Sequence, residues 1–514
     1  MLSLRRLFLV SAMVLLALAP AGATSLRTNI NADPAMVDPV TYSELIAGDI
    51  LKNIYEGFTD TDAQGGIRPM LALRWEAHPD NLGWRFFLRP NVTFHTGRPF
   101  TAHDVKATFE TLLIPANRGG LAVQYLGRIV GAGDLRAGRS TALPGITVVD
   151  DLTLDVRFTM PDVLFPIYPF MFFDREALRE RGVAGLAQAS AGTGPFKLNA
   201  WRRGVEVVLD AHAGYWGGAP RINGVRFMVV PSDDTAINQF VADDLDLVML
   251  QTEAARRVLR DNTLRPRGIQ SPAAQITYLG MNQGAFAPFR DRRVREAFCI
   301  SLDRAAMVRG IFGGLGQPLH GQITPGVAGH NPDLPAIRFD RDRARRLMAE
   351  AGFPEGRGFP PLAITAITSN RTESAYIADQ LRQVLGITVD VSVLERGTFL
   401  RLLNAGEVPF FHWGWTAGYP DAMYFLSQVW HSGSPFNRAR YSNPAFDQLI
   451  DQAGVVADNA ARYQLYHQAE RKLLEDWGGC GTTVRTQIAL VRPNVRGVVL
   501  TPFRFMPFEA VSVE

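Results

Sequence analysis

From about residue 275 the chain alternates between short apolar runs and amphipathic stretches, and this alternation limits the fold more than any other feature. Helices that alternate with strands predict a mixed or parallel α/β sheet covered by helices. Ligands of such sheets bind beyond the carboxyl ends of the strands. We expect strands at 275–281, 362–368, 387–394 and 408–415, and helices at 291–300, 304–312, 341–351 and 372–385.

The chain before residue 275 has a different pattern. Residues 152–159 alternate apolar and polar side chains, which is typical of a strand with one wet face. Further strands are expected at 205–210 and 225–230. A chain of 514 residues has room for two or three domains. We therefore expect at least two lobes, one on each side of residue 275.

The first 23 residues have the pattern of a secretory signal peptide. Arg5 and Arg6 precede an apolar run from residue 7 to 19, and small residues follow at 21–23. No later segment reaches the ~20 apolar residues of a membrane span, and no Cys follows the run for lipid attachment. We therefore expect a soluble protein exported to a periplasm. Removing residues 1–23 lowers the net charge from +3 to +1, which does not favour binding of nucleic acid.

The chain has two cysteines, Cys299 and Cys480. Cys299 stands among apolar residues at helical spacing, and Cys480 follows two glycines. An exported protein can pair its cysteines. We nevertheless expect two buried thiols rather than a disulfide.

Residues 410–426 combine aromatic side chains with turn-forming residues, which suits a surface that holds a planar or extended ligand. Trp413 and Trp415, two residues apart on the strand expected at 408–415, point to the same face. His412 points the other way and is expected in the core or on the surface. It has no companion ligands, so we expect neither a metal site nor a cofactor. Arg371 follows a predicted strand and is either a bidentate donor to a ligand carboxylate or a solvated surface residue.

Five separated segments, in order, resemble the extracellular solute-binding proteins of family 5. These are the oligopeptide, dipeptide and nickel receptors of ATP-binding-cassette (ABC) importers. The resemblance extends from about residue 28 to 490. The matching segments are Tyr55-Glu56-Gly57-Phe58, the stretch 94–105 (Phe-His-Thr-Gly-Arg-Pro-Phe-Thr-Ala-His-Asp-Val), Gly192-Thr193-Gly194-Pro195-Phe196 with Tyr215-Trp216, Arg293-Val294-Arg295-Glu296-Ala297, and Gly414–Asp421.

The resemblance implies a two-lobed periplasmic-binding-protein fold of type II, in its three-domain variant. Domain I would be discontinuous (24–57, 166–277 and 486–514), domain II would cover 58–165, and domain III would cover 278–485. The lobes would close over a solute about hinge strands near 278–282 and 483–487, and the closed monomer would dock on a membrane permease. Most matched residues, such as Thr101 and Asp104, are expected to be structural.

The resemblance also implies a ligand site. Trp415 would line it, and Tyr419 would add stacking surface. Backbone groups of 413–417 and 31–33 would hold an extended ligand like an added strand. The residues expected at the ligand are Asn31, Asp33, Arg371, Trp413, Trp415, Thr416, Ala417, Gly418, Tyr419 and Asp421.

One position departs from the family pattern. In peptide-binding members an Asp in this region pairs with the ligand's ammonium group, and here that position is Gly418. A buried ammonium without its carboxylate loses roughly 2–5 kcal/mol. Either Asp421 or another acid takes over, or the ligand has no free α-ammonium group. We expect unmodified di- and tripeptides to bind poorly.

The leading hypothesis is a periplasmic receptor that captures a peptide or peptide-like solute and delivers it to an ABC permease. The alternatives are a receptor for a non-peptide solute (an opine, a sugar conjugate or chelated nickel) and a periplasmic chaperone. An enzyme is not expected, because the chain has no Gly-x-Ser-x-Gly, no His-Glu-x-x-His and no persuasive Cys–His pair.

Overall fold

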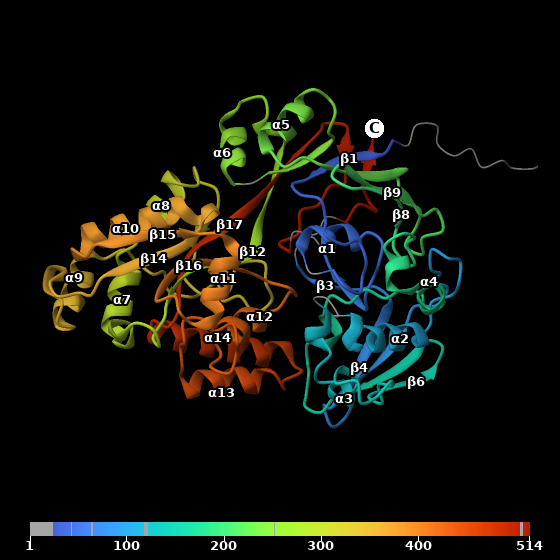
Figure 1. Ribbon diagram of the computed structural model, residues 1–514, viewed down its shortest axis with the longest axis horizontal. Helices are drawn as coiled ribbons and strands as arrows, with labels where there is room; N and C mark the ends of the chain where they lie inside the picture. Colours follow the sequence, from blue (N-terminus) through green and yellow to red (C-terminus); the bar gives the residue numbers. More distant parts are fainter. Residues whose placement is uncertain (1–23, 43, 63–64, 118–121, 251, 504–506) are drawn as a thin grey trace, which may run out of the picture.

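The computed structural model describes residues 24–42, 44–62, 65–117, 122–250, 252–503 and 507–514. The predicted signal peptide (1–23) lies outside these residues. The protein has two lobes joined by a mixed sheet (Figure 1). In the described part of the chain, no helix has the length and apolar character needed to cross a membrane.

The main sheet has eleven strands and runs through both lobes. Its strand order is β15-β14-β16-β12-β17-β11-β1-β10-β9-β8, and β13 pairs with β17. The strands are β1 (Leu26–Ile30), β8 (Phe196–Arg202), β9 (Glu206–Ala211), β10 (Gly224–Val229), β11 (Leu247–Leu250), β12 (Gly268–Met281), β13 (Gln317–Pro318), β14 (Leu362–Ile367), β15 (Val389–Leu394), β16 (Phe410–Thr416) and β17 (Cys480–Val491).

The strands β12 and β17 connect the two lobes (Figure 1). They pair antiparallel, and the pairing shifts register twice between Pro272 and Tyr278. Pro272 has no N–H to donate to a neighbouring strand, which suits an irregular stretch. The hinge strands predicted near 278–282 and 483–487 both belong to this pair. The irregular part of β12 begins a few residues earlier than the predicted segment.

The second lobe confirms the predicted alternation of helices and strands. β14 pairs parallel with β15 and with β16, and helices cover this part of the sheet. Their apolar faces meet in a core that includes Phe298, Ile364, Ile377 and Phe410. The helices are α7 (Arg292–Ile300), α8 (Arg304–Gly310), α9 (Arg341–Glu350), α10 (Arg371–Leu385), α11 (Arg396–Ala405), α12 (Met423–Phe425), α13 (Pro444–Ala453) and α14 (Asn459–Glu475).

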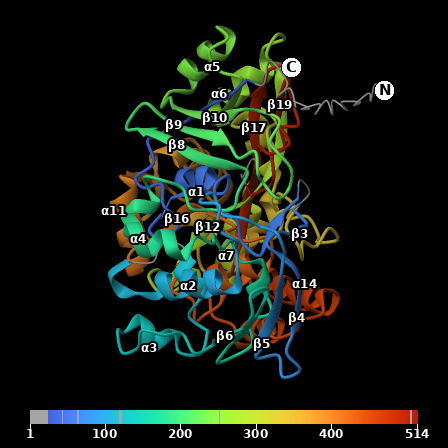
Figure 2. The same cartoon turned by 90° about the vertical axis from the view of Figure 1, so that its right-hand side faces the viewer.

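The first lobe combines its part of the main sheet with a four-stranded antiparallel sheet, β4-β5-β7-β6 (Figure 2). β7 buries Leu154 and Val156 and leaves its alternate residues half-buried, as the sequence pattern predicts. Phe58 stacks on Phe86, with 3.9 Å between ring centroids, in the adjoining core. The remaining elements are α1 (Leu45–Leu51), α2 (Ala102–Leu113), α3 (Ala132–Arg136), α4 (Arg175–Leu186), α5 (Asp233–Val241), α6 (Thr252–Arg260), β2 (Thr59–Thr61), β3 (Ile67–Pro69), β4 (Ala72–Ala77), β5 (Gly83–Leu88), β6 (Ile146–Asp150), β7 (Thr153–Arg157), β18 (Val495–Arg496) and β19 (Ser512–Val513).

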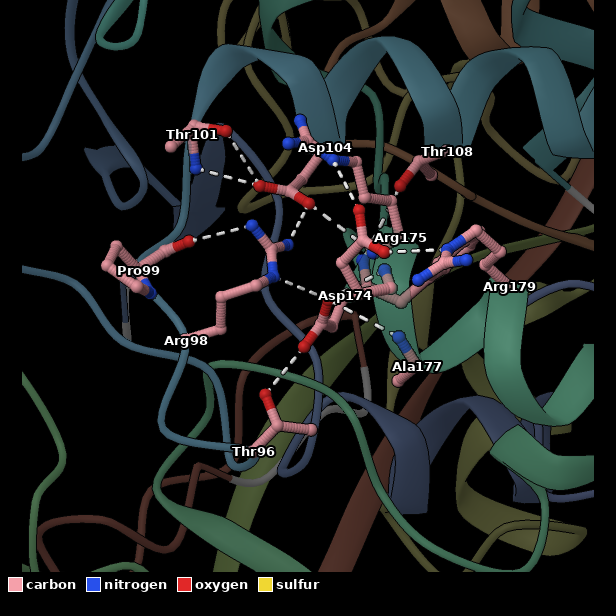
Figure 3. Close-up of polar contacts among 12 residues, drawn as sticks. Thr96, Arg98, Pro99, Thr101, Asp104, Thr108, Asp174, Arg175, Ala177 and Arg179 are labelled. Carbon is pink, nitrogen blue, oxygen red and sulfur yellow. Dashed lines mark hydrogen bonds and ion pairs between the residues drawn. The ribbon is translucent and has the colours of Figure 1, made fainter.

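The segment 94–105 has a structural role in the first lobe (Figure 3). The Thr101 backbone N–H donates to Asp104 Oδ2 at 3.0 Å, which completes a capping box at the start of α2. Arg98 bridges Asp104 and Asp174, and its Nε donates to Asp174 Oδ1 at 2.7 Å. The Thr96 hydroxyl donates to the other Asp174 oxygen at 2.5 Å. These contacts join the start of α2 to the start of α4.

Glu56 joins two of the five matched segments within the first lobe. Its buried carboxylate accepts hydrogen bonds from Thr193 Oγ1 at 2.6 Å, Tyr215 Oη at 2.7 Å and Trp216 Nε1 at 2.8 Å. Burial raises the pKa of Glu56 to about 7, although all three donors oppose that shift. These segments, which lie far apart in the sequence, therefore meet in one buried polar cluster.

Cys299 and Cys480 form a disulfide, so the prediction of two buried thiols is wrong. Packing of α7 beside β17 brings the two Cα atoms to 5.7 Å, although 181 residues separate the cysteines in the chain. Arg304 is fully buried beside them and donates from Nε to the Gly481 carbonyl at 2.8 Å and from Nη1 to the Cys299 carbonyl at 3.0 Å. The local pattern around each cysteine carries no information on this tertiary contact.

We expect loss of the disulfide to destabilise the protein. The bond closes a long loop, and removing such a bond costs about 2–4 kcal/mol of unfolding free energy. Urea unfolding of the Cys299→Ser/Cys480→Ser variant measures this loss. Wild-type protein in reductant should match the variant. Equal stability of the oxidised wild type and the variant would contradict the expectation.

We expect Glu56 to make stability depend on pH. The folded-state pKa of about 7 lies above the ordinary value of 4.5. Between these values the folded protein holds a proton that the unfolded chain has lost, so the unfolding free energy falls as pH rises from about 4.5 to about 7. Urea unfolding across this range should show a shallower fall for Glu56→Gln than for wild type. Glu180→Gln, at an exposed carboxylate, is the control and should keep the wild-type slope.

Candidate functional site

A cavity of about 760 Å³ has walls from both lobes, and we call it the interlobe cavity. The first lobe supplies Gln124, Tyr125, Arg128, Asp162 and Tyr168. The second lobe supplies Tyr419, Met423, Tyr424, His431 and Phe436, among others. A smaller cavity of about 60 Å³ is lined by Glu56, Asp60, Arg68 and Glu509 of the first lobe and by Gly418, Tyr419 and Pro420 of the second. Tyr419 lines both cavities.

The strand β16 carries the predicted aromatic residues to this region. It pairs antiparallel with β12, which places Trp415 opposite Ile276. Trp415 is half-buried and packs on two residues of the cavity wall, Phe436 at 5.1 Å and Tyr424 at 6.2 Å between ring centroids. Trp415 therefore lies behind the wall of the interlobe cavity, in contact with two residues that line it.

Trp413 occupies a more interior position than Trp415. Its ring packs on Phe399 of α11 at 5.1 Å, and the side chain is buried. His412, which precedes Trp413, is buried in the core, with Nε2 at 3.3 Å from Thr482 Oγ1. Burial lowers the pKa of His412 to about 3, so the imidazole is neutral near pH 7. The position of His412 agrees with the predicted core role.

The loop that follows β16 brings the two lobes together. Thr416 is the last residue of β16 and lies opposite Gln275 of β12. The N–H of the next residue, Ala417, donates to the Ala274 carbonyl at 2.8 Å. The Tyr419 ring then packs on Tyr168 of the first lobe, with 5.1 Å between ring centroids. This aromatic contact crosses the interlobe cavity.

Gly418 lies at the closest part of this approach. A Cβ atom at Gly418 would stand 2.9 Å from Tyr125 Oη of the first lobe and 3.1 Å from Tyr424 Oη of the second. Both distances are shorter than ordinary contacts between a Cβ atom and an oxygen. The absence of a side chain at 418 is therefore what allows the two hydroxyls to come this near.

Asp421 has partners inside the second lobe. Its buried carboxylate accepts from Tyr466 Oη at 2.7 Å, from the Met423 N–H at 2.9 Å and from Arg462 Nη2 at 3.3 Å. Burial raises the pKa of Asp421, and the charge of Arg462 opposes this shift. The structure thus gives Asp421 a cation of its own and does not include it in either cavity wall.

Of the ten predicted ligand residues, Gly418 and Tyr419 line one or both cavities, and the others lie outside the two cavity walls. Asp33, after β1, accepts from Trp201 Nε1 at 3.1 Å and pairs with Arg203 at 3.4 Å. Asn31 and Arg371 are exposed, and Arg371 is the first residue of α10. Their contact with a ligand stays a prediction.

The tyrosines of the first lobe that line the cavity, Tyr125 and Tyr168, carry no signal in the sequence that predicts this role. Tyr125 stacks on Tyr168 at 4.6 Å between ring centroids, and both line the interlobe cavity. Tyr125 belongs to a short 3-10 turn and Tyr168 follows another, so neither has the periodic context of a helix or a strand. Only the fold brings them to Tyr419. Within the described ranges, no three His, Cys, Asp or Glu side chains gather in a way that would hold a metal ion.

Comparison with known proteins assigns the family. The model of bacterial extracellular solute-binding proteins, family 5, matches residues 66–437. A probable di/tripeptide-binding protein 5 of Pseudomonas aeruginosa is 26% identical over 97% of this chain and 98% of its own length. The periplasmic oligopeptide-binding protein OppA of Salmonella typhimurium is 27% identical over 92% of this chain and 89% of its own.

Solved structures share the fold. The periplasmic murein tripeptide-binding protein MppA, in its unliganded open form, superposes with a TM-score of 0.81. It is 23% identical in sequence, and the match covers 96% of this chain and 98% of that one. The two-lobed fold, the cavity between the lobes and the match over residues 66–437 lead to one conclusion: the chain belongs to the bacterial extracellular solute-binding proteins of family 5.

Proposed function

We propose that this chain is the solute-binding receptor of an ABC importer. It captures a peptide or peptide-like solute between its lobes and delivers it to a membrane permease. The observation that carries this proposal is the interlobe cavity of about 760 Å³, which is large enough for a small ligand and has walls from both lobes. Relatives named as di/tripeptide-binding and oligopeptide-binding proteins support the ligand class.

The proposed mechanism is closure of the lobes about β12 and β17. The register shifts between Pro272 and Tyr278 interrupt the ladder where the two lobes meet, so bending there breaks few regular hydrogen bonds. The proposed domain I is 24–57, 166–277 and 486–514, domain II is 58–165 and domain III is 278–485. We further propose that the receptor is exported without a lipid anchor, acts as a monomer in the periplasm, and is not an enzyme.

The proposed site combines aromatic walls with backbone groups at the end of β16. Tyr419 supplies stacking surface, and Trp415 supports Tyr424 and Phe436 from behind the wall. Thr416, Ala417 and Gly418 precede Tyr419 and offer the backbone groups nearest to the cavities. A non-peptide solute, such as an opine, a sugar conjugate or chelated nickel, is the alternative that uses the same cavity.

We expect a mixed pool of short peptides, half of them N-acetylated, to raise the melting temperature of protein that has been unfolded and refolded to remove carried-over solute. A ligand that binds only the folded state stabilises it by mass action, by about 2.7 kcal/mol at a hundredfold excess over Kd. The measurement is a thermal shift with parallel panels of opines, sugars and nickel chelates. A shift with one of those panels alone would favour the non-peptide alternative. No shift together with turnover of a chromogenic ester would contradict the receptor proposal.

We expect Tyr419→Ala to weaken ligand binding by roughly 10- to 100-fold, because buried aromatic anchors at such contacts are worth about 2 kcal/mol or more. Tyr419 contacts Tyr168 across the lobes, so the variant should also close less fully when ligand is added. Isothermal titration gives the affinity, and small-angle X-ray scattering gives the closure. Tyr463→Ala, at a half-buried tyrosine outside both cavity walls, is the matched control. Unchanged affinity and closure in Tyr419→Ala would contradict this role.

A further inference from the structure

We propose that the site accepts a ligand whose end beside Gly418 is an uncharged, oxygen-bearing group rather than a free ammonium, and that the hydroxyls of Tyr125 and Tyr424 recognise this group. The class comprises N-acylated and lactam-terminated peptides. This inference rests on the proposed receptor function and specifies the ligand of the same site.

Two tyrosine hydroxyls lie close to Gly418. Tyr125 Oη and Tyr424 Oη lie 2.9 and 3.1 Å from one point, the place where a Cβ of Gly418 would stand. The two hydroxyl oxygens are therefore at most about 6 Å apart, and each comes from a different lobe. Both tyrosines line the interlobe cavity, and both side chains are only half-buried. Gly418 itself lines only the smaller cavity, so it is a ligand group in the interlobe cavity that meets the two phenols.

The phenols of Tyr125 and Tyr424 carry no charge at physiological pH. Burial raises the pKa of Tyr424 to about 12 and that of Tyr125 well above its ordinary value. The proximity of Tyr424 also raises the pKa of Tyr125. Both hydroxyls thus stay neutral and keep their protons at physiological pH. A neutral O–H donates to carbonyl and hydroxyl oxygens, and it supplies no negative charge to balance an ammonium group.

The negative charge that a ligand ammonium needs would have to come from a carboxylate of the cavity walls. In the interlobe cavity wall, Asp162 accepts from Tyr168 Oη at 2.9 Å and lies 4.0 Å from Arg128, and Asp451 lies 3.4 Å from His431. Asp162 is also almost fully buried, at 5% exposure. Asp162 thus has partners within its own lobe, whereas the Asp451 side chain is 74% exposed and has only the His431 imidazole beside it.

The carboxylates of the smaller cavity are also engaged. Glu56 accepts three hydrogen bonds from its own lobe. Asp60 pairs with Lys52 and with Arg68, both at 3.4 Å, and Glu509 pairs with Arg68 at 3.2 Å. Asp421, the nearest acid along the chain, is buried against Arg462. Among the described residues of both cavity walls, each buried or half-buried carboxylate is therefore engaged by groups of its own lobe, and only Asp451, whose side chain is largely exposed to solvent, has no more than an imidazole beside it.

The sequence left two possibilities open: another acid balances a ligand ammonium, or the ligand has no free α-ammonium group. An ammonium group beside Gly418 would be enclosed by aromatic rings and neutral hydroxyls. The faces of tyrosine rings attract cations, but this attraction is weaker than a buried ion pair. An acyl oxygen would instead accept hydrogen bonds from the two hydroxyls without leaving a charge unbalanced. The site therefore favours the uncharged end.

The test uses the full mature chain, refolded without ligand, and a pool of tripeptides of mixed sequence. Half of the pool carries a free amino terminus and half is N-acetylated. Mass spectrometry of the peptides retained by the protein gives the ratio of the two forms. We expect the acetylated form to be enriched more than about tenfold, since a buried charge without its partner weakens binding by more than that. Enrichment of the free-amine form would overturn the inference and leave the receptor proposal intact. Retention of neither form would overturn the peptide-like ligand class itself, and the inference with it.

Variants test the two hydroxyls directly. Tyr424→Phe should lower the enrichment ratio several-fold, while Tyr463→Phe, outside both cavity walls, should keep the wild-type ratio. Gly418→Asp combined with Tyr125→Phe removes the nearest hydroxyl and introduces a carboxylate, and it should reverse the ratio in favour of the free amine. The melting temperature of each variant without ligand checks folding. A ratio in folded Tyr424→Phe equal to that of wild type would overturn the assigned role of Tyr424.

Discussion

The rest of the structure depends on the pairing of β12 with β17. These two strands belong to the sheets of both lobes at once, because β12 pairs with β16 in the second lobe and β17 pairs with β11 in the first. Each end of the pair is fixed by strong local contacts. In the second lobe the Cys299–Cys480 disulfide ties α7 to the start of β17. In the first lobe Asp246, before β11, pairs with Arg27 at 2.7 Å and lies 3.6 Å from Arg492. The irregular stretch of β12 between these anchors is then the natural place for bending.

The buried ionisable groups make each lobe rigid in itself. Glu56 is held by three donors of the first lobe, and Asp421 by Tyr466 and Arg462 of the second. Burial raises the pKa of both carboxylates, and removing any one partner would leave a poorly solvated charge. Such clusters resist rearrangement inside a lobe. The contacts of Tyr419 across the cavity are instead aromatic, and aromatic surfaces separate without leaving a charge unpaired. This division of interactions suits two rigid bodies that move relative to each other.

Much of the fold could be predicted from sequence, because local patterns encode it. The alternation of helices and strands after residue 275 and the wet-faced strand β7 follow from periodicity, and the capping box at Thr101 follows from residue spacing. The site could be predicted only in part. The segment of Trp415 and Tyr419 has a distinctive composition, whereas Tyr125 and Tyr168 lie in short turns with no periodic signal. The prediction that Cys299 and Cys480 are two unpaired thiols was wrong for the same reason. Their proximity arises from the packing of elements that lie 181 residues apart in the chain.

Gly418 shows how one position can link ligand choice to closure. A Cβ there would meet the hydroxyl of Tyr125, so the approach of the lobes and the absence of a side chain depend on each other. The two hydroxyls that face this point come from different lobes. A ligand group that bonds to both gains its full interaction only when the lobes are close, and a ligand shifts a conformational equilibrium by the difference in its affinity for the two states. A group that bonds to one hydroxyl alone makes the same bond in the open and the closed state, so it does not favour closure. In the proposed site, the geometry at Gly418 would therefore couple recognition of the ligand's end to the population of the closed state, through the same two tyrosines.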